Sequence, residues 1–242
     1  MNLLILSSII FLPLSLIISY FRKPKIYIFS IEGNIGSGKS TLVKLLSRYN
    51  PHYHFLQEPV NIWKEIKDSD ENNILSVFYK DQTRFAYIFQ NFAFITRITT
   101  LLALIAKVKS MFQDKYIIVE RSIYSDKNVF AKMLYDDKKI SELEYKIYNY
   151  WFYKLHNKVF FSGHIYLEVD ANVAAKRINK RSRSEEDSIP LEYLQSLNDY
   201  HKKWLDNTPV PVITINVNDD FEYNKTKFIE INSKIVHFIT HI

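Results

Sequence analysis

Apolar and polar positions alternate in a regular way after Pro24, where short apolar runs are separated by longer helix-length stretches. Each run is rich in β-branched or aromatic residues and is short enough to be a strand buried on both faces. The expected strands span residues 26–31, 53–57, 116–119, 164–169 and 212–215, and the expected helices span residues 41–49, 75–108, 126–135, 141–160, 172–180 and 191–206. Strands that alternate with helices in this way predict an α/β domain with a parallel sheet.

The domain organisation is simple. A chain of 242 residues is long enough for one well-cored domain and short for two. No repeat, proline-rich linker or low-complexity tract divides the region from residue 25 to residue 242. We therefore expect one domain over residues 26–242, preceded by a separate segment of residues 1–25.

The N-terminal segment is apolar. Residues 3–20 carry no charge, and Arg22, Lys23 and Lys25 follow them. A helix of about 18 residues is only just long enough to cross a bilayer. Two interpretations stay open: a membrane anchor whose basic flank holds the rest of the chain in the cytoplasm, or an apolar leader without a role, as from a misplaced start. A secretory signal or a mitochondrial transit peptide fits less well, because no basic residue precedes the apolar run.

Charge and cysteine content narrow the function classes. The net charge is +6, but the lysines and arginines are spread along the whole chain. A nucleic-acid tract would be more clustered, so phosphate ligands or solubility explain the charge better, and we expect no nucleic-acid partner. The absence of cysteine excludes disulfides, thiolate metal sites and cysteine catalysis.

A phosphate-binding motif follows the first expected strand. The segment from Gly33 to Ser40 matches G-x-x-x-x-G-K-[ST] completely and precedes an expected helix. Its glycines let backbone N–H groups turn toward phosphate oxygens, and the helix N-terminus favours the anion. Lys39 would reach the outer phosphates, and the Ser40 hydroxyl would bind magnesium. The motif alone does not choose between kinase, GTPase, motor and transporter, although nothing resembles the guanine-reading Asn-Lys-x-Asp.

Charged residues close two of the expected strands. Glu120 and Arg121 end the strand at residues 116–119, and Glu58 ends the strand at residues 53–57. Ligands of parallel α/β sheets bind at the carboxyl ends of the strands. Glu120 can therefore meet magnesium, and Arg121 can meet an oxygen of the acceptor or of the phosphate. Glu58 can take a proton from an attacking hydroxyl. Taken singly, each could also be an ordinary surface charge.

Two further segments suggest an acceptor site and a lid. Phe89, Gln90, Ala93 and Arg97 share one face of a helix, and a glutamine can read a nucleobase edge with both a donor and an acceptor. The segment 177–186 carries three arginines out of a helix into a polar stretch. A mobile lid that brings arginines to a transferring phosphoryl group has this pattern. A solvated face and a solvated charge run are the alternatives.

Together these motifs resemble the deoxynucleoside kinase family, which includes deoxycytidine, deoxyguanosine and mitochondrial thymidine kinases. The resemblance runs from about residue 26 to residue 205. It is carried by Ile31 to Thr41, Glu58-Pro59-Val60, Tyr79-Lys80-Asp81, Phe89-Gln90, Glu120 to Ser125, and Arg181 to Glu186, and it is extended by Ile189 to Leu194 and Trp204-Leu205. Six ordered motifs are far more specific than any one of them.

The resemblance implies a fold and a role for each matched residue. The implied fold is an α/β P-loop kinase with a five-stranded parallel sheet surrounded by helices and an arginine-rich lid. The catalytic residues would be Glu58 as the base on the 5′-hydroxyl, Arg121 beside it, and Lys39. ATP would be bound by Gly33, Asn34, Ile35, Gly36, Ser37, Gly38, Lys39, Ser40 and Thr41, with Arg177, Arg181 and Arg183 in the lid, and magnesium by Ser40 and Glu120.

The resemblance also implies a nucleoside pocket. Tyr79 and Glu186 would hold the 3′-hydroxyl, and Tyr79 would crowd the 2′ position. Gln90 would read the base, Phe130 would stack on it, and Trp63, Leu75 and Phe89 would line the pocket. Family members usually dimerise through a helical face, so a homodimer is expected.

Base preference is expected to depend on Ala93, Arg97 and Asp126, where the family's branches differ. Both charged residues are present, as in the deoxycytidine and deoxyguanosine branch. An Asp126 carboxylate would accept from the amino group of cytosine or adenine and would face thymine O4 unfavourably. Arg97 would fill the space of the thymine methyl group and pair with Asp126.

The sequence thus predicts ATP-dependent phosphorylation of a deoxynucleoside 5′-hydroxyl for salvage of DNA precursors, with a cytoplasmic active site. Deoxycytidine is the first expected substrate, and deoxyadenosine and deoxyguanosine follow. The alternatives are a thymidine or broad-specificity kinase, then a nucleoside monophosphate kinase, then a non-catalytic structural relative. Monophosphate kinases usually carry Asp-Arg-Tyr where this chain has Glu120-Arg121-Ser122, and a non-catalytic relative would have lost Lys39, Glu58 or Arg121.

Overall fold

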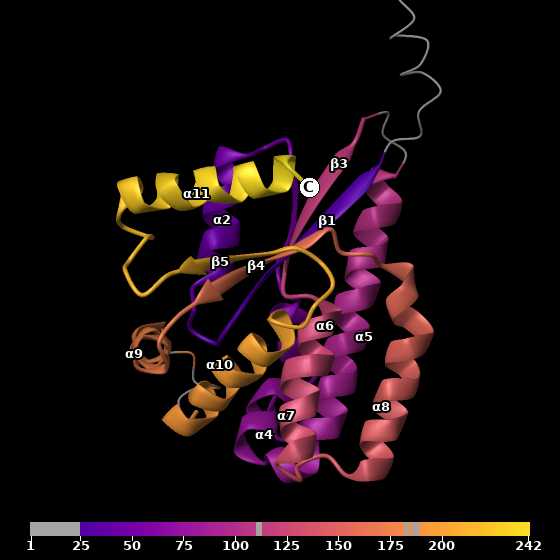
Figure 1. Cartoon of the computed structure of the whole chain (residues 1–242). Helices are drawn as coiled ribbons and strands as arrows, with labels where there is room; N and C mark the ends of the chain where they lie inside the picture. The colour runs from indigo at the N-terminus through magenta and orange to yellow at the C-terminus, as the bar shows by residue number, and fades with distance from the viewer. Residues whose placement is uncertain (1–24, 110–112, 182, 184, 186–188) are drawn as a thin grey trace, which may run out of the picture.

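Five parallel strands form one sheet in the described part of the chain, in the spatial order β2-β3-β1-β4-β5 (Figure 1). The computed structural model describes residues 25–109, 113–181, 183, 185 and 189–242. The strands are β1 Ile26–Gly33, β2 His54–Leu56, β3 Lys115–Glu120, β4 Gly163–Glu168 and β5 Val212–Asn216. The predicted α/β fold with a five-stranded parallel sheet is confirmed.

The helices that connect and flank the strands are α2 Lys39–Tyr49, α3 Val60–Glu65, α4 Ile74–Lys80, α5 Gln82–Val108, α6 Ile123–Ser125, α7 Lys132–Asp136, α8 Glu142–Leu155, α9 Ala171–Arg181, α10 Leu191–Leu205 and α11 Lys225–Thr240. A π-helix, η1, spans Asp126–Ala131, and a 3-10 turn, η2, spans His156–Lys158.

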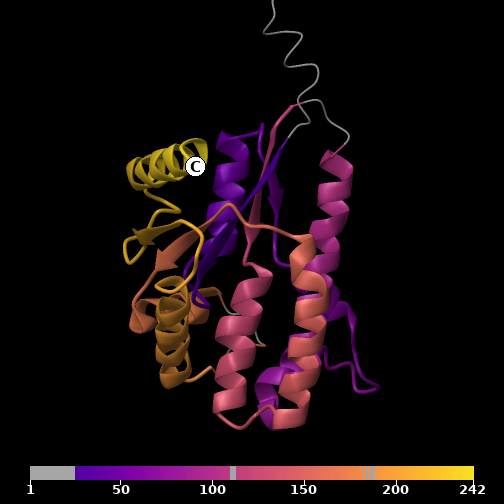
Figure 2. The same ribbon diagram turned by 45° about the vertical axis from the view of Figure 1, so that its right-hand side comes forward.

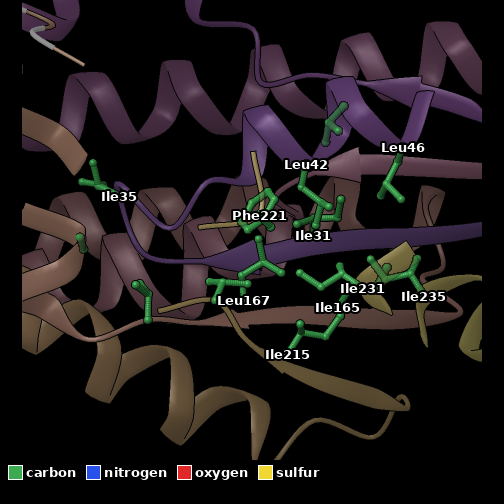
Figure 3. Close-up of a cluster of buried hydrophobic side chains, with 14 of the residues drawn as sticks. Ile31, Ile35, Leu42, Leu46, Ile165, Leu167, Ile215, Phe221, Ile231 and Ile235 are labelled. Carbon is green, nitrogen blue, oxygen red and sulfur yellow. The ribbon is translucent and has the colours of Figure 1, made fainter. Parts of the chain in front are cut away.

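Helices cover both faces of the sheet (Figures 1 and 2). On one face α2 and α11 pack on β1, β4 and β5 through a buried cluster that includes Leu42, Leu46, Ile165, Ile231 and Ile235 (Figure 3). On the other face α5 and α8 pack on β1 and β3 through a cluster that includes Ile28, Phe94, Ile98, Ile117 and Phe152. Neighbouring β1 residues point to opposite faces, and this double burial explains the apolar character of the strand runs.

The structure corrects two expected elements and adds helices that were not expected. The single helix expected over residues 75–108 is two helices that meet at Asp81, which ends α4 and whose side chain accepts a hydrogen bond from the Arg84 backbone N–H (3.1 Å). The segment expected as a regular helix from residue 126 begins as the π-helix η1. Helices α3 and α11 were not expected.

Helix α5 is apolar nearly all round. It is the one helix among the described residues that is long and apolar enough to cross a membrane, and 44% of its most apolar window is buried inside the protein. It also carries the buried Gln90 and Arg97 and packs on the sheet, as a core helix does. The apolar residues 3–20 lie outside the described residues.

Candidate active site

One cavity lies at the carboxyl edge of the sheet, beside the phosphate-binding loop. Its volume is about 250 Å³. Most of the predicted site residues line it, namely Ile35, Gly36, Gly38, Lys39, Ser40, Thr41, Glu58, Trp63, Leu75, Tyr79, Phe89, Gln90, Ala93, Arg97, Glu120, Arg121, Asp126, Phe130, Arg181 and Arg183. The structure therefore brings together motifs that are widely separated in the sequence.

The loop between β1 and α2 depends on glycine at two close approaches. Gly36 and Gly38 have positive φ values of 77° and 90°. A Cβ at Gly36 would lie 2.5 Å from the Ala174 carbonyl oxygen, and one at Gly38 would lie 2.9 Å from the Phe221 ring. No larger residue fits these positions without displacing the neighbouring backbone or ring.

Lys39 is the first residue of α2 and is buried behind this loop. Its Nζ donates to the Asn34 carbonyl oxygen at 2.5 Å and to Ser37 Oγ at 3.4 Å. Burial, and then the nearby Arg121 charge, lower the pKa of Lys39 to about 7. An ammonium held in this way gains a strong electrostatic partner when anionic phosphates enter the loop.

Ser40 and Glu120 form an oxygen pair suited to magnesium. Ser40 Oγ donates to Glu120 Oε1 at 2.5 Å, and Glu120 Oε2 lies 3.4 Å from the Glu58 backbone nitrogen. Among the described residues no group of three His, Asp or Glu side chains is arranged to hold a metal by itself. Magnesium commonly binds through one or two protein oxygens together with phosphates and waters, so this pair fits the ion.

Glu58, at the end of β2, is held by two arginines. Arg97 Nη2 donates to Glu58 Oε1 at 2.8 Å, and Arg121 Nε lies 3.4 Å from the same oxygen. Burial raises the pKa of Glu58, but the charges of Arg97 and Arg121 outweigh burial and bring the pKa to about 2. Glu58 is therefore an ionised hydrogen-bond acceptor and a weak base.

Arg97 connects Glu58 to Asp126. Arg97 Nε donates to Asp126 Oδ2 at 2.8 Å, and Nη1 donates to the Glu120 carbonyl oxygen at 3.1 Å. Burial raises the pKa of Asp126, and the Arg97 charge opposes that rise. Since a guanidinium only donates, the paired Asp126 oxygen is an acceptor. The π-helix η1 carries Asp126 and Phe130 to the cavity, and such bulges are frequent at functional sites.

Aromatic rings form the walls around Gln90. Trp63 Nε1 donates to Thr96 Oγ1 at 2.9 Å, which fixes the indole. The Phe89 ring packs edge-on to Trp63 at 5.3 Å and stacks on Phe78 at 4.6 Å. Gln90 itself is 2% exposed and lines the cavity. A flat apolar slot with one amide at its wall suits a planar base that carries donors and acceptors.

The arginine segment lies along two neighbouring cavities. Arg181 and Arg183 line the active-site cavity, and Arg177 and Arg181 line the neighbouring one. Arg177 donates through Nη2 to the Asn218 and Asp219 carbonyl oxygens (3.2 and 3.1 Å). Glu186, expected at the 3′-hydroxyl, lies outside the described residues. The neighbouring Glu185 bonds Lys64 Nζ at 2.8 Å.

Sequence reasoning missed several residues of the site region. Lys44, Val60, Phe78 and Tyr193 also line the active-site cavity, and residues 220–223 after β5 line the neighbouring cavity together with Gly36 and Gly38. The strand-end rule that found Glu58 and Glu120 could have found this last loop, since it follows the carboxyl end of a parallel strand. Gly33, Asn34 and Ser37 do not line the cavity and support the loop from behind. Asn34 Nδ2 donates to the Leu194 carbonyl oxygen at 2.7 Å.

Comparison with known proteins gives a consistent result. Residues 29–240 match the family model described as deoxynucleoside kinase. The chain is 38% identical over 221 residues to a probable deoxycytidine kinase of fowlpox virus (strain NVSL), covering 88% of each chain. It is 34% identical to the deoxycytidine kinase of Homo sapiens (87% of this chain, 90% of the relative). It is 31% identical to the mitochondrial deoxyguanosine kinase of Xenopus laevis (87% and 88%).

Proposed function

We infer, because this chain belongs to the deoxynucleoside kinase family, that it transfers the γ-phosphate of ATP to the 5′-hydroxyl of a deoxynucleoside, with deoxycytidine preferred. The observation that carries the proposal is the ion network Glu58–Arg97–Asp126 in the same cavity as Lys39 and Gln90. One end of this network would face the reacting hydroxyl, and the other end would face the base.

The phosphate end of the cavity supports ATP and magnesium as donor and cofactor. Lys39 and the loop amides would hold the outer phosphates, while Ser40 and Glu120 would hold the ion. Magnesium in that position would neutralise charge on the phosphate oxygens. Arg181 and Arg183 line the same cavity, and as lid arginines they would reach the transferring group.

Glu58 would orient the 5′-hydroxyl as a hydrogen-bond acceptor. A carboxylate with a pKa of about 2 is a poor base in the ground state. Phosphoryl transfer through a loose transition state needs little early proton removal, because the hydroxyl becomes acidic as its bond to phosphorus forms. We propose that Glu58 takes the proton late in the transfer, after positioning the nucleophile.

Deoxycytidine preference is supported by the Arg97–Asp126 pair. Asp126, held by Arg97 over 2.8 Å, offers an acceptor to an exocyclic amino group. Thymine would place an oxygen there and leave two acceptors facing each other, at a cost of about 1–3 kcal/mol. Relatives described as deoxycytidine and deoxyguanosine kinases are consistent with this branch.

The decisive experiment measures kcat/KM for the four deoxynucleosides with ATP and magnesium. We expect deoxycytidine first and thymidine last by about tenfold or more. The double variant R97M/D126A should raise thymidine turnover relative to deoxycytidine. An unchanged ranking would refute the specificity assignment, and inactivity toward all four would refute the kinase assignment.

We also propose that the protein is a homodimer with its active site in the cytoplasm. The outer face of α8, with Leu143 69% exposed and Trp151 47% exposed, supports the dimer. The proposed use of ATP as phosphate donor supports a cytoplasmic active site.

A further inference from the structure

A buried histidine on α10 touches the guanidinium that faces Glu58. We propose that His201 is a positioning residue that holds Arg121 against Glu58 and thereby keeps the acceptor carboxylate in place for the reaction. The inference rests on the proposed function, in which Glu58 and Arg121 prepare the attacking hydroxyl. No motif in the sequence singles out His201.

The hydrogen bonds of His201 define its tautomer. Nδ1 lies 2.6 Å from the Leu197 carbonyl oxygen, one helical turn earlier. A carbonyl oxygen only accepts, so Nδ1 carries the proton. The other ring nitrogen, Nε2, lies 3.4 Å from Arg121 Nη1, and a guanidinium only donates. His201 is thus a neutral imidazole whose Nε2 lone pair is directed at Arg121.

The surroundings of His201 favour this neutral form. The residue is 0% exposed. Its ring stacks near Tyr166 at 6.0 Å and meets the Phe130 ring edge-on at 6.1 Å. Burial, and then the Arg121 charge, hold the pKa of His201 well below its usual range. A protonated ring would turn an N–H toward the guanidinium and place two cations in contact.

The position of Arg121 depends on several contacts, and the acceptor on His201 is one of them. Arg121 follows β3 with a left-handed backbone conformation (φ 64°), and its side chain is buried. Nη1 also donates to the Gly33 carbonyl oxygen at 2.8 Å, and the guanidinium lies 4.6 Å over the Phe130 ring. Of the two arginines on Glu58, Arg121 is the more distant, at 3.4 Å against 2.8 Å for Arg97. A small displacement of Arg121 therefore breaks its contact with Glu58 first.

The alternative is a histidine that only fills space and caps the Leu197 carbonyl. The two interpretations differ in which ring nitrogen matters: Nδ1, which bonds Leu197, or Nε2, which faces Arg121. Glutamine places its amide near the position of Nε2 and can accept from Arg121, but it loses the bond to Leu197. Asparagine places its amide near Nδ1 and can keep the bond to Leu197, but it does not reach Arg121. A structural role favours asparagine, whereas the positioning role favours glutamine.

The test compares His201→Gln with His201→Asn, using the best deoxynucleoside substrate of the wild-type enzyme. We expect kcat to fall about tenfold in His201→Asn, because the hydrogen bond between His201 and the charged Arg121 is lost in the reacting complex. The KM for ATP and the KM for the deoxynucleoside should change little. In His201→Gln we expect kcat within about threefold of wild type, even where its thermal stability is the lower of the two. Equal kcat values, or a more active His201→Asn, would overturn the proposal.

A second measurement does not depend on activity. Long-range ¹H–¹⁵N spectra of the wild-type protein report the protonation of each imidazole nitrogen, with His201 assigned by comparison with His201→Gln. A neutral ring protonated at Nδ1 supports the arrangement, and a ring protonated at Nε2 overturns it. If the wild-type protein phosphorylates no deoxynucleoside, the proposed function fails, and the spectrum still decides the role of His201 toward Arg121.

Discussion

At the scale of single residues, the chemistry depends on charges that are buried together. Glu58 pairs with Arg97 and Arg121, Arg97 also pairs with Asp126, and all four residues line the cavity. Burial of any one alone would be costly, so each charge requires the others. Removing one member should therefore change the protonation of those that stay.

Arg97 controls the pKa of Glu58. In the wild-type protein that pKa is about 2, so Glu58 stays ionised over the working range, and the acid limb of kcat/KM should not come from it. In R97M we expect the pKa of Glu58 to rise, because one of the cations that oppose the effect of burial is removed. The fall of kcat/KM at acid pH that protonation of Glu58 causes should then move toward neutral pH. The measurement is kcat/KM from pH 4.5 to pH 8.

Asp126 is the other carboxylate that loses its partner in R97M. The double variant R97M/D126A separates the two groups: an acid limb that persists belongs to Glu58, and one that disappears belongs to Asp126. Glu58→Gln should lower kcat about 100-fold at every pH. A fully active Glu58→Gln variant is incompatible with the assigned role.

Lys39 should take up a proton when ATP binds. Its pKa is lowered to about 7 by burial and then by Arg121, so the side chain is largely neutral at pH 8 in the free protein. Phosphate charges favour the ammonium and raise the pKa, so binding at pH 8 should take up about one proton per site. Titration calorimetry of magnesium-ATP in buffers of different ionisation enthalpy measures this uptake.

The matched control for this measurement is Lys39→Arg, which stays charged in both states and should bind ATP without taking up the proton. Equal uptake in the two proteins would show that another group is responsible.

Some residues of the candidate site could be predicted from the sequence and others could not. Gly33 to Ser40 form a local motif, and Glu58 and Glu120 follow from the strand-end rule, so these positions were predictable. His201 was not predictable, because it acts through a contact with Arg121, 80 positions away, and no local pattern reports such a contact. The motif contains Asn34, but it does not show the contact of Asn34 with the Leu194 carbonyl oxygen, 160 positions away. The contact of Arg177 with the backbone after β5 depends on how α9 packs against that loop, which is a tertiary property.

At the scale of elements, the break between α4 and α5 decides how the acceptor site is built. Asp81 ends α4 and caps α5, so Tyr79 and Gln90 reach the cavity from two different helices. Periodicity alone showed one continuous apolar stretch, since residues on both sides of the break are buried. The motif Tyr79-Lys80-Asp81 contained the capping residue, but its role appears only in the helix geometry.

Asp81→Ala should destabilise the protein by about 0.5–2 kcal/mol, because the Arg84 backbone N–H in the first turn of α5 loses its acceptor. Asp81→Asn keeps a capping oxygen and should lie within a few tenths of a kcal/mol of wild type. Urea unfolding of the three proteins gives the comparison. Equal losses in both variants would assign the effect to charge and not to capping.

Helix α11 could have been predicted from the sequence, whereas the π-helix η1 could not. Helix α11 buries Phe228, Ile231, Ile235 and Ile239, a helical spacing visible in the sequence. The π-helix η1 was not visible, because a π-bulge depends on a single extra residue in a helical turn and leaves the composition unchanged. Its effect on the direction of Asp126 and Phe130 therefore required the structure.

At the scale of the whole molecule, exposed apolar side chains gather on α8. Leu143, Ile147, Tyr150 and Trp151 are all exposed. At about 100° per residue they fall within a third of the helix circumference. Helix α8 runs beside α5 on the same side of the sheet (Figures 1 and 2). A contiguous apolar face of this kind indicates an association surface.

We expect the protein to run at twice the chain mass of 28.8 kDa in light scattering after gel filtration. L143E/W151E should run as a monomer, because two charges would be buried in the interface. Ile229→Glu is the matched control, since Ile229 is 45% exposed on α11, which covers the other face of the sheet. A monomeric wild-type protein, or a dimeric L143E/W151E, would contradict this interface.

The strand order has a consequence for the synthesis of the chain. β1 is the first strand to be synthesised, but its two neighbours in the sheet, β3 and β4, lie at residues 115–120 and 163–168 and are synthesised much later. Until then its backbone N–H and C=O groups and its apolar side chains lack their native partners. Loop closure over such sequence distances makes folding slow. The sheet that supports the phosphate-binding loop is incomplete until β4 has been synthesised, so nascent chains shorter than about 170 residues are exposed to aggregation and to chaperones.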